Sequence, residues 1–115
     1  MKVELAGLHY SSDYGVGLVI DVVDQDNFTV LAKGKHWKYR FIVDDDDTKR
    51  WYLNGKYHRT DGPAVERAEG TKYWYINGKR HRTDGPAVEW ANGSKDWYLN
   101  GKRLSKARWK ALTTA

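Results

Sequence analysis

Apolar and polar positions alternate in short runs along most of this chain, and the runs are separated by residues that favour turns. Before residue 48, the alternation predicts three strands, over the sequences GVGLVIDVV, NFTVLA and HWKYRFIV. After residue 48, short aromatic or β-branched runs flank Asn54-Gly55, Asn77-Gly78 and Asn100-Gly101. Asn-Gly is the strongest local signal of a two-residue hairpin turn, since both residues tolerate a positive φ. The pattern therefore predicts an all-β, mainly antiparallel fold.

The hairpin pattern repeats with a period of 23 residues, which is the spacing of Trp51, Trp74 and Trp97. The sequence WYLNGKYHRTDGPAVE returns as WYINGKRHRTDGPAVE, and WYLNGKR begins a third copy. Such a period is typical of stacked units that bury a face only against their neighbours. Thr-Asp-Gly-Pro is predicted to end the second strand of a unit, and AEGT or ANGS to form the next turn. We expect a meander of strand, tight turn, strand, second turn and strand in each unit.

These patterns divide the chain into an acidic β segment at 1–47, the β-hairpin repeats at 48–104, and a short helix with a tail at 105–115. In the last part, Ser105 is the expected N-cap of a helix that extends to Leu112. We expect this helix to cover the edge of the last strand, because repeat arrays need terminal caps.

The end of the N-terminal segment can be aligned with the repeats. Phe41-Ile42-Val43 takes the position of Ala64-Val65-Glu66, and DDDDT takes the position of the turn that follows. We therefore expect the three N-terminal strands to continue into the repeats as one sheet.

Hairpin register predicts two faces in each repeat. A two-residue turn puts Tyr75 opposite Arg80 and Tyr73 opposite Arg82, and side chains alternate between the faces of a strand. Trp51, Trp74 and Trp97 then belong to a packing face, and the tyrosine and arginine side chains belong to the other. The repeated histidine is expected to pack on Trp and to hydrogen-bond a backbone carbonyl. The Asp of Asp-Gly-Pro is expected to bond its own backbone.

The distribution of charge adds a candidate function to the second face. Residues 1–47 carry a net charge of −4, and residues 48–115 carry +9. A basic half rich in aromatic rings suits an anionic partner with phosphates and bases, because rings stack on bases and guanidinium groups bind phosphates. Arg–Tyr stacking also stabilises a sheet by about 0.5–1 kcal/mol without any ligand. The predicted ligand-binding residues are Tyr52, Tyr75, Tyr98, Arg59, Arg80, Arg82, Arg103, Lys79, Lys102, Lys106 and Arg108.

No catalytic or metal-binding pattern is apparent in the sequence. The chain has no cysteine, and HYSSD at residues 9–13 groups its His, Ser and Asp locally, whereas hydrolase triads assemble from distant segments. DDDD at 44–47 lacks the ligand spacing of a calcium loop and is expected to be a solvated turn. We expect a protein that is not an enzyme and needs no cofactor or metal. The absence of a long apolar run predicts no membrane partner and a cytoplasmic location.

The unit W-Y-x-N-G-K-x-H-R-T-D-G-P-A-V-E resembles short β-hairpin repeats in proteins of large DNA viruses and tailed phages, and it is distantly similar to MORN-type repeats. The match covers residues 49 to about 103. MORN repeats space their glycine and aromatic residues differently, so lipid binding does not carry over. The resemblance implies a hairpin array and a viral origin, with action in the host cytoplasm. DYGVGLVIDVVDQDNFTV, near the N-terminus, resembles the opening hairpin of a Tudor-like small barrel.

Two functions follow as hypotheses. The first is a non-enzymatic binding protein, a phage counter-defence or host-takeover factor, whose Tyr/Arg face binds a nucleotide signal or a nucleic acid. The alternative is a protein-interaction module that blocks a host protein through its exposed sheet surface. A homo-oligomer is also expected, because two and a fraction repeats make a short array, unless the N-terminal strands and the C-terminal helix close its ends.

Overall fold

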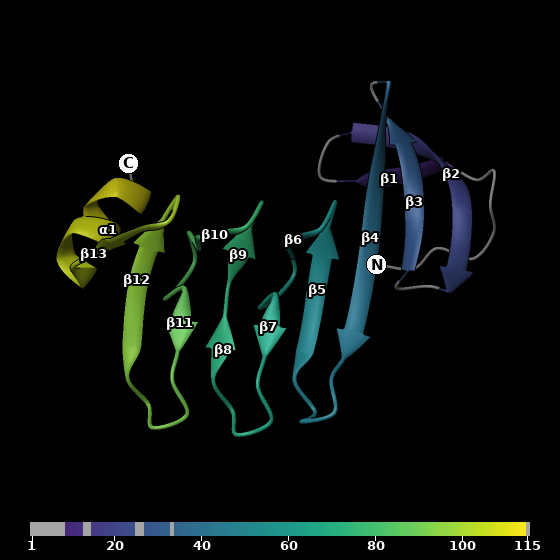
Figure 1. Cartoon of the computed structure of the whole chain (residues 1–115). Coiled ribbons are helices and arrows are strands. Elements are labelled where there is room, and N and C mark those ends of the chain that lie inside the picture. Colours follow the sequence, from purple (N-terminus) through teal and green to yellow (C-terminus); the bar gives the residue numbers. More distant parts are fainter. Residues whose placement is uncertain (1–8, 13–14, 25–26, 33, 115) are drawn as a thin grey trace.

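The chain forms a mostly antiparallel β-sheet with one short C-terminal helix, which confirms the predicted fold class (Figure 1). This computed structural model describes residues 9–12, 15–24, 27–32 and 34–114. The strands are β1 (His9–Ser12), β2 (Gly15–Asp24), β3 (Asn27–Ala32), β4 (Lys35–Val43), β5 (Lys49–Leu53), β6 (Lys56–Tyr57), β7 (Val65–Glu66), β8 (Lys72–Tyr73), β9 (Tyr75–Ile76), β10 (Lys79–Arg80), β11 (Val88–Glu89), β12 (Lys95–Leu99) and β13 (Lys102–Leu104), and the helix is α1 (Lys106–Thr113). The main sheet runs from β1 to β13 in chain order, with β6 beside β5, while β9 and β10 form a separate pair.

The N-terminal strands and the repeats share this main sheet, as predicted. The three expected strands correspond to β2, β3 and β4, and the unpredicted β1 pairs with β2. The second half of β4 then pairs with the whole of β5, from Tyr39 opposite Leu53 to Val43 opposite Lys49. The array therefore does not begin at an open edge, because β4 covers the first hairpin.

The predicted hairpin turns are present at all three Asn-Gly sites. Asn54, Asn77 and Asn100 each have a φ of 50°, and the glycines after them have φ values of 79°, 80° and 83°. Positive φ at both positions defines the type I′ turn that matches the twist of the flanking strands. The local sequence thus determines where each hairpin reverses.

A second kind of turn repeats at the opposite ends of the strands. In 44–48, 67–71 and 90–94, the first backbone N–H donates to the last carbonyl at 2.9 Å. In the first of these turns, the Asp46 carboxylate accepts from the Thr48 backbone N–H at 3.2 Å, and hydrogen bonds with Thr48 lower the pKa of Asp46. Among the described residues, no three His, Cys, Asp or Glu side chains gather as a metal site. DDDDT therefore forms the first copy of the repeated turn, as its alignment predicts.

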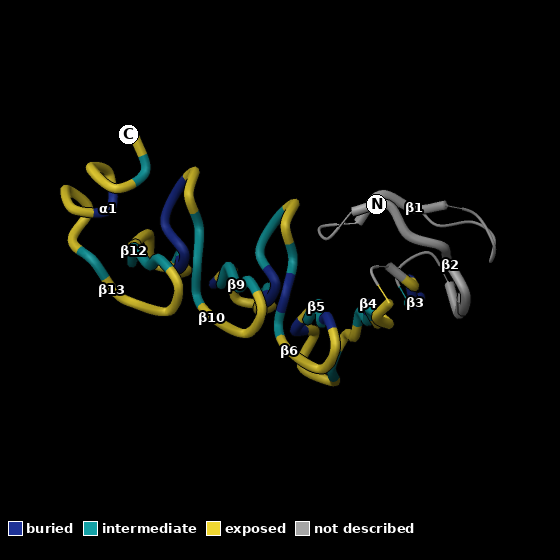
Figure 2. Tube along the Cα trace, turned by 90° about the horizontal axis from the view of Figure 1, so that it is seen from above, coloured by how far each residue is buried: buried dark blue, intermediate teal, exposed yellow. Residues whose placement is uncertain are grey.

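The meander is interrupted in a way that the sequence does not predict. β10 contains two residues, and the chain then leaves the sheet as the loop at 81–87, just as it leaves as the loop at 58–64 after β6. Tyr73 consequently lies opposite Val65 and Val88, and its predicted partner Arg82 lies elsewhere. Figure 2 shows both loops rising from one side of the sheet, the side on which α1 also lies.

The C-terminal helix begins and ends within one residue of its predicted bounds. The Ser105 side chain accepts a hydrogen bond from the Arg108 backbone N–H at 3.2 Å, which confirms the predicted N-cap. The helix packs on β12, where Trp109 is buried against Trp97 at a ring-centroid distance of 4.4 Å. It therefore covers the face of β12, whereas we expected it to cover the edge of the last strand. In the described part of the chain, no helix has the length and apolar character that crossing a bilayer requires.

Candidate binding surfaces on the two faces of the sheet

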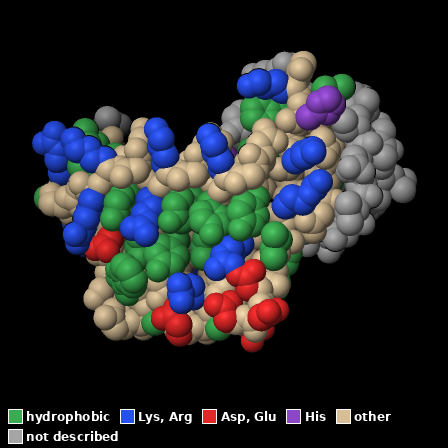
Figure 3. All heavy atoms as spheres, in the orientation of Figure 1, with side chains coloured by type: hydrophobic (Ala, Val, Ile, Leu, Met, Phe, Trp, Pro, Cys, Tyr) green, Lys and Arg blue, Asp and Glu red, His purple; other side chains and the backbone are tan. Residues whose placement is uncertain are grey.

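The repeats present two chemically different faces. We call the side from which 58–64 and 81–87 rise the loop face, and it carries Trp74 beneath the loops. We call the other side the tyrosine face, and its rings are Tyr52, Tyr57, Tyr73, Tyr75 and Tyr98, which are all half-buried. Figure 3 shows the tyrosine face, where hydrophobic side chains form a patch across the repeats with Lys and Arg side chains set into and around it.

The tyrosine rings form a row that crosses from one hairpin to the next. Tyr52 lies opposite Tyr57 on the neighbouring strand, with ring centroids 5.1 Å apart. Tyr57 lies 5.1 Å from Tyr75 of the next hairpin, and Tyr75 lies 6.5 Å from Tyr73. Burial and a hydrogen bond with Tyr57 raise the pKa of Tyr52. The rings therefore make one continuous aromatic surface, which is the arrangement that the sequence predicts for Tyr52 and Tyr75.

Arg80 lies in the middle of this aromatic surface. Its Cζ atom is 5.2 Å from the ring centroid of Tyr73 and 5.3 Å from that of Tyr98. Its Nε donates to the Tyr75 hydroxyl at 3.3 Å, and its Nη1 donates to the Tyr98 hydroxyl at 3.2 Å. Burial lowers the pKa of Arg80, but the hydrogen bonds to the two hydroxyls outweigh it, so that the pKa is raised overall. Arg80 is therefore a charged group fixed by neutral partners.

Arg59 and Arg82 do not lie with the tyrosines, so their predicted placement is wrong. The Cζ of Arg59 lies 3.8 Å from the ring centroid of Trp51, and the Cζ of Arg82 lies 3.9 Å from that of Trp74. The alternation rule applies only while the chain stays paired in the sheet. Because β10 ends at Arg80, the rule no longer fixes the direction of Arg82. Both arginines therefore belong to the loop face.

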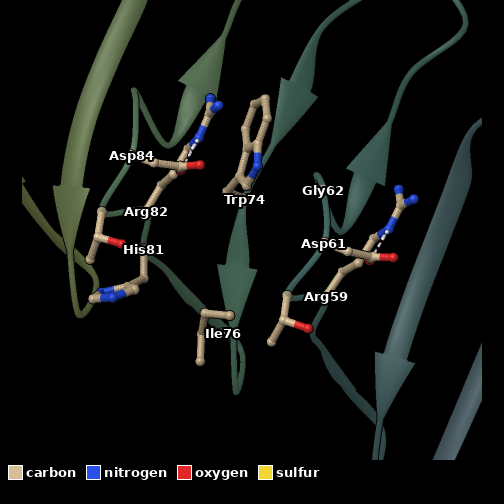
Figure 4. A pocket seen from close by; sticks show the side chains of 10 residues that line it. Arg59, Asp61, Gly62, Trp74, Ile76, His81, Arg82 and Asp84 are labelled. Atoms are coloured by element: carbon tan, nitrogen blue, oxygen red, sulfur yellow. Dashed lines mark hydrogen bonds and ion pairs between the residues drawn. The ribbon is translucent and has the colours of Figure 1, made fainter. Parts of the chain in front are cut away.

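Each of these two arginines holds its own loop (Figure 4). The Nε of Arg82 donates to the Asp84 carboxylate at 2.9 Å, and its Nη1 donates to the Pro86 carbonyl at 3.0 Å and to the Glu89 carboxylate at 2.7 Å. Arg59 makes the same three bonds 23 residues earlier. We call each set, with its Trp ring, an arginine clamp. The expected bond of the Asp side chain to its own backbone is wrong, because the carboxylate accepts from the arginine.

The glycine of Asp-Gly-Pro is required for space in the clamp. A Cβ atom at Gly85 would lie 2.6 Å from the Cζ of Arg82, and a Cβ at Gly62 would lie 3.0 Å from the Cζ of Arg59. Neither glycine has a positive φ. The repeated R-T-D-G-P sequence is therefore a structural motif in which a guanidinium group is enclosed between a Trp ring and a glycine.

The repeated histidine connects successive hairpins. The Nδ1 of His58 accepts from the Asn77 backbone N–H at 3.0 Å, and the Nδ1 of His81 accepts from the Asn100 backbone N–H at 2.9 Å. The expected carbonyl partner is wrong for this nitrogen, because Nδ1 accepts a hydrogen bond here and does not donate one. The histidine has the predicted structural role, but it acts on the turn of the next repeat.

The other predicted residues of the repeats lie outside the tyrosine row. Arg103 lies opposite Tyr98 and donates to the Asp96 carboxylate at 2.9 Å, so its charge is paired. Lys79 and Lys102 are exposed at the hairpin tips, at register positions that alternate with the tyrosine row. The structure thus brings Tyr52, Tyr75, Tyr98 and Arg80 together and leaves the lysines outside the row.

The helix carries the remaining predicted residues on the loop side. The Nζ of Lys106 lies 5.6 Å from the ring centroid of Trp97, and Arg108 is exposed. Trp109 was not a predicted site residue, although one signal points to it. The third repeat has Leu104-Ser105 where the others have His-Arg, so Trp97 has no clamp arginine, and Trp109 packs against it instead.

Comparison of the chain with protein-family models, curated protein sequences and solved structures found no match in any of the three. The resemblance to viral hairpin repeats and the Tudor-like resemblance therefore stay predictions from the sequence.

Proposed function

We propose that the tyrosine face binds single-stranded nucleic acid, with tyrosine rings stacking on bases and Arg80 bound to phosphate. The observation that carries this proposal is the state of Arg80. In the part of the chain that the structure describes, Arg59, Arg82 and Arg103 each form an ion pair with a carboxylate, and Arg80 forms none. A guanidinium that is held in place without a counter-ion is prepared to bind an anion.

The shape of the surface favours a strand over a single nucleotide. The row crosses several β-strands, which lie about 4.8 Å apart in a sheet, so successive hairpins offer rings at regular intervals. Proteins that bind single strands without sequence preference combine such rings with a basic path for the backbone. The net charge of +9 on residues 48–115 supplies the attraction. Use of this binding by a phage against its host, and the absence of enzymatic activity, stay predictions from the sequence.

Fluorescence anisotropy of labelled oligothymidine and oligouridine tests the proposal. We expect binding that weakens with salt, because phosphate contacts release counter-ions. Arg80→Met should lower the affinity about tenfold or more, since a charge-assisted hydrogen bond and a cation near stacked bases are lost. Tyr98→Leu should lower it about tenfold, because stacking contributes about 1–3 kcal/mol per base.

Lys95→Gln is the matched control, because it removes the same charge from an exposed position opposite Glu89, on the loop face. We expect this variant to change the affinity less than about twofold. Equal losses for Arg80→Met and Lys95→Gln would mean that net charge alone attracts the strand. That result, or no binding at low salt, contradicts a role for the tyrosine face.

A further inference from the structure

A groove of about 590 Å³ lies on the loop face, between the two loops (Figure 4). Trp74 and Ile76 line its floor, residues 59–62 form one wall, and residues 81–84 form the other. The groove lies on the opposite side of the sheet from the tyrosine row. A ligand bound there is independent of the proposed nucleic-acid site.

The corresponding groove of the next repeat is filled by the chain itself. Its floor carries Trp97, which is 23 residues after Trp74, and α1 replaces the loop that would form its outer wall. The indole of Trp109 packs against Trp97, with ring centroids 4.4 Å apart and the ring planes tilted by 50°, and its Nε1 donates to the Arg82 carbonyl at 2.8 Å. The side chain is only 9% exposed. One groove of this fold therefore already holds a tryptophan side chain between the indole of its floor and a backbone carbonyl of the loop.

The open groove has an indole on its floor and a loop carbonyl on its wall at the equivalent positions of the repeat. Trp74 corresponds to Trp97, and Arg59, whose carbonyl corresponds to that of Arg82, lies on the groove wall. One difference is that the guanidinium of Arg82 covers part of the Trp74 ring, with its Cζ atom 3.9 Å from the ring centroid. An indole in the open groove would therefore lie over Ile76 and the remaining part of Trp74, with a cation beside it, which favours an aromatic ring further.

The charge at the rim of the open groove indicates which residues would flank a tryptophan that binds there. Asp61 and Asp84 lie one on each wall, each paired with the arginine of its own clamp, and their side chains remain 57% and 83% exposed, so both carboxylates stay accessible to a ligand. The segment that fills the next groove has the opposite charge, because Lys106, Arg108 and Lys110 surround Trp109. We propose that the open groove is a docking site for a tryptophan side chain carried by a partner protein on a short basic segment.

A second copy of this chain is a poorer occupant. Its own Trp109 already fills a groove, so an exchange between two copies would lose one contact for each contact that it forms. A partner whose tryptophan is exposed loses nothing equivalent when it binds. The docking site is therefore assigned to a foreign segment.

A peptide with the sequence of residues 105–114, SKARWKALTT, is the probe. Isothermal titration calorimetry on the full chain should give saturable binding with one site. The peptide with Trp109→Ala should bind at least about tenfold more weakly, because the ring supplies most of the buried apolar area. An oligothymidine added first should not compete, since the two sites lie on opposite faces.

Thr60→Lys tests the location of the site, because Thr60 is an exposed residue of the groove wall, and a lysine there both narrows the groove and repels a basic peptide. Ser94→Lys is the matched control, with the same added charge at an exposed turn far along the strands from the groove. We expect an affinity loss of about tenfold for the first variant and less than about twofold for the second. The thermal unfolding of both variants is measured first, and the peptide variant keeps the test valid if Thr60→Lys is misfolded.

Three results would overturn the proposal: no peptide binding, binding that is indifferent to Trp109→Ala, or equal losses for the two lysine variants. Light scattering adds a fourth. If the chain forms dimers that Trp109→Ala dissociates, then a second copy is the occupant and the assignment to a foreign partner is wrong.

Discussion

The arginines of the two faces differ in what surrounds them. On the loop face, Arg82 is bound by two carboxylates and a carbonyl and stacks on Trp74. On the tyrosine face, Arg80 is held by two neutral hydroxyls. The two residues are separated by one position in the sequence, yet one has its charge satisfied inside the fold and the other keeps its charge for a ligand. Residue type alone therefore does not identify a binding residue in this repeat.

The largest expected effect is on stability, and it comes from the clamp. Arg82→Met removes the charged bond to Glu89, the bond to the Pro86 carbonyl and the cation–π contact with Trp74. We expect the free energy of unfolding to fall by about 2–3 kcal/mol. Arg80→Met should cost less than about 1 kcal/mol, because hydroxyl partners at a half-buried site remain hydrated. Urea denaturation of both variants measures the difference, and a larger loss for Arg80→Met would reverse our assignment of the two roles.

The next largest effect is a loss of stability when a methyl group is placed beside the guanidinium of a clamp. Gly85→Ala puts a methyl group 2.6 Å from the Cζ of Arg82, which four contacts hold in place, so we expect a loss of about 1–2 kcal/mol. Gly62→Ala should cost less, because the corresponding distance is 3.0 Å. Thermal unfolding of the two variants checks the order. If the two losses are equal or reversed, the enclosed guanidinium is not the cause.

A smaller effect is expected at the connection between hairpins on the loop face. His58→Ala leaves the Asn77 backbone N–H without its imidazole acceptor, and His58 itself is only 4% exposed. We expect a loss of about 1 kcal/mol, the usual net worth of a hydrogen bond. Hydrogen exchange of the Asn77 amide is the direct measurement, and the exchange rate should rise in the variant. An unchanged rate would show that the imidazole does not protect this amide.

The smallest effect is the change of stability with pH that the ionisation of Tyr52 on the tyrosine face causes. Burial and the hydrogen bond with Tyr57 raise the pKa of Tyr52 above its ordinary value of 10.0. A raised pKa means that the folded state prefers the protonated phenol. The stabilisation is therefore complete below pH 10.0 and is lost as the pH rises through the pKa of the folded state. Ultraviolet titration should show one late-ionising tyrosine that Tyr52→Phe removes, and an unchanged titration in the variant would contradict the shift.

The sequence by itself determined the features that depend on neighbouring residues. Asn-Gly specifies a turn because both residues accept a positive φ, and Ser105 caps α1 because its side chain reaches a backbone N–H three residues later. The period of 23 then repeats these local choices, and it places Tyr75 opposite Arg80 as predicted. The three predicted N-terminal strands follow from the alternation of apolar and polar residues, and their junction with the repeats follows from the alignment of residues 41–43 with 64–66. The pattern of β1 is too short to be recognised.

Only the tertiary structure decided where the side chains after each hairpin point. Arg82 reaches the loop face because contacts with Trp74 and Glu89, eight residues before it and seven after it, are formed when the chain leaves the sheet. Strand alternation does not describe Arg82, because it lies beyond the end of β10 and its backbone N–H donates to the Tyr98 carbonyl of the next repeat, at 3.3 Å. The place of Trp109 likewise depends on how α1 packs on Trp97, which the residues adjacent to Trp109 do not specify. Local backbone conformation depends on adjacent residues, whereas the partner of a long side chain depends on packing between segments that are distant in the sequence.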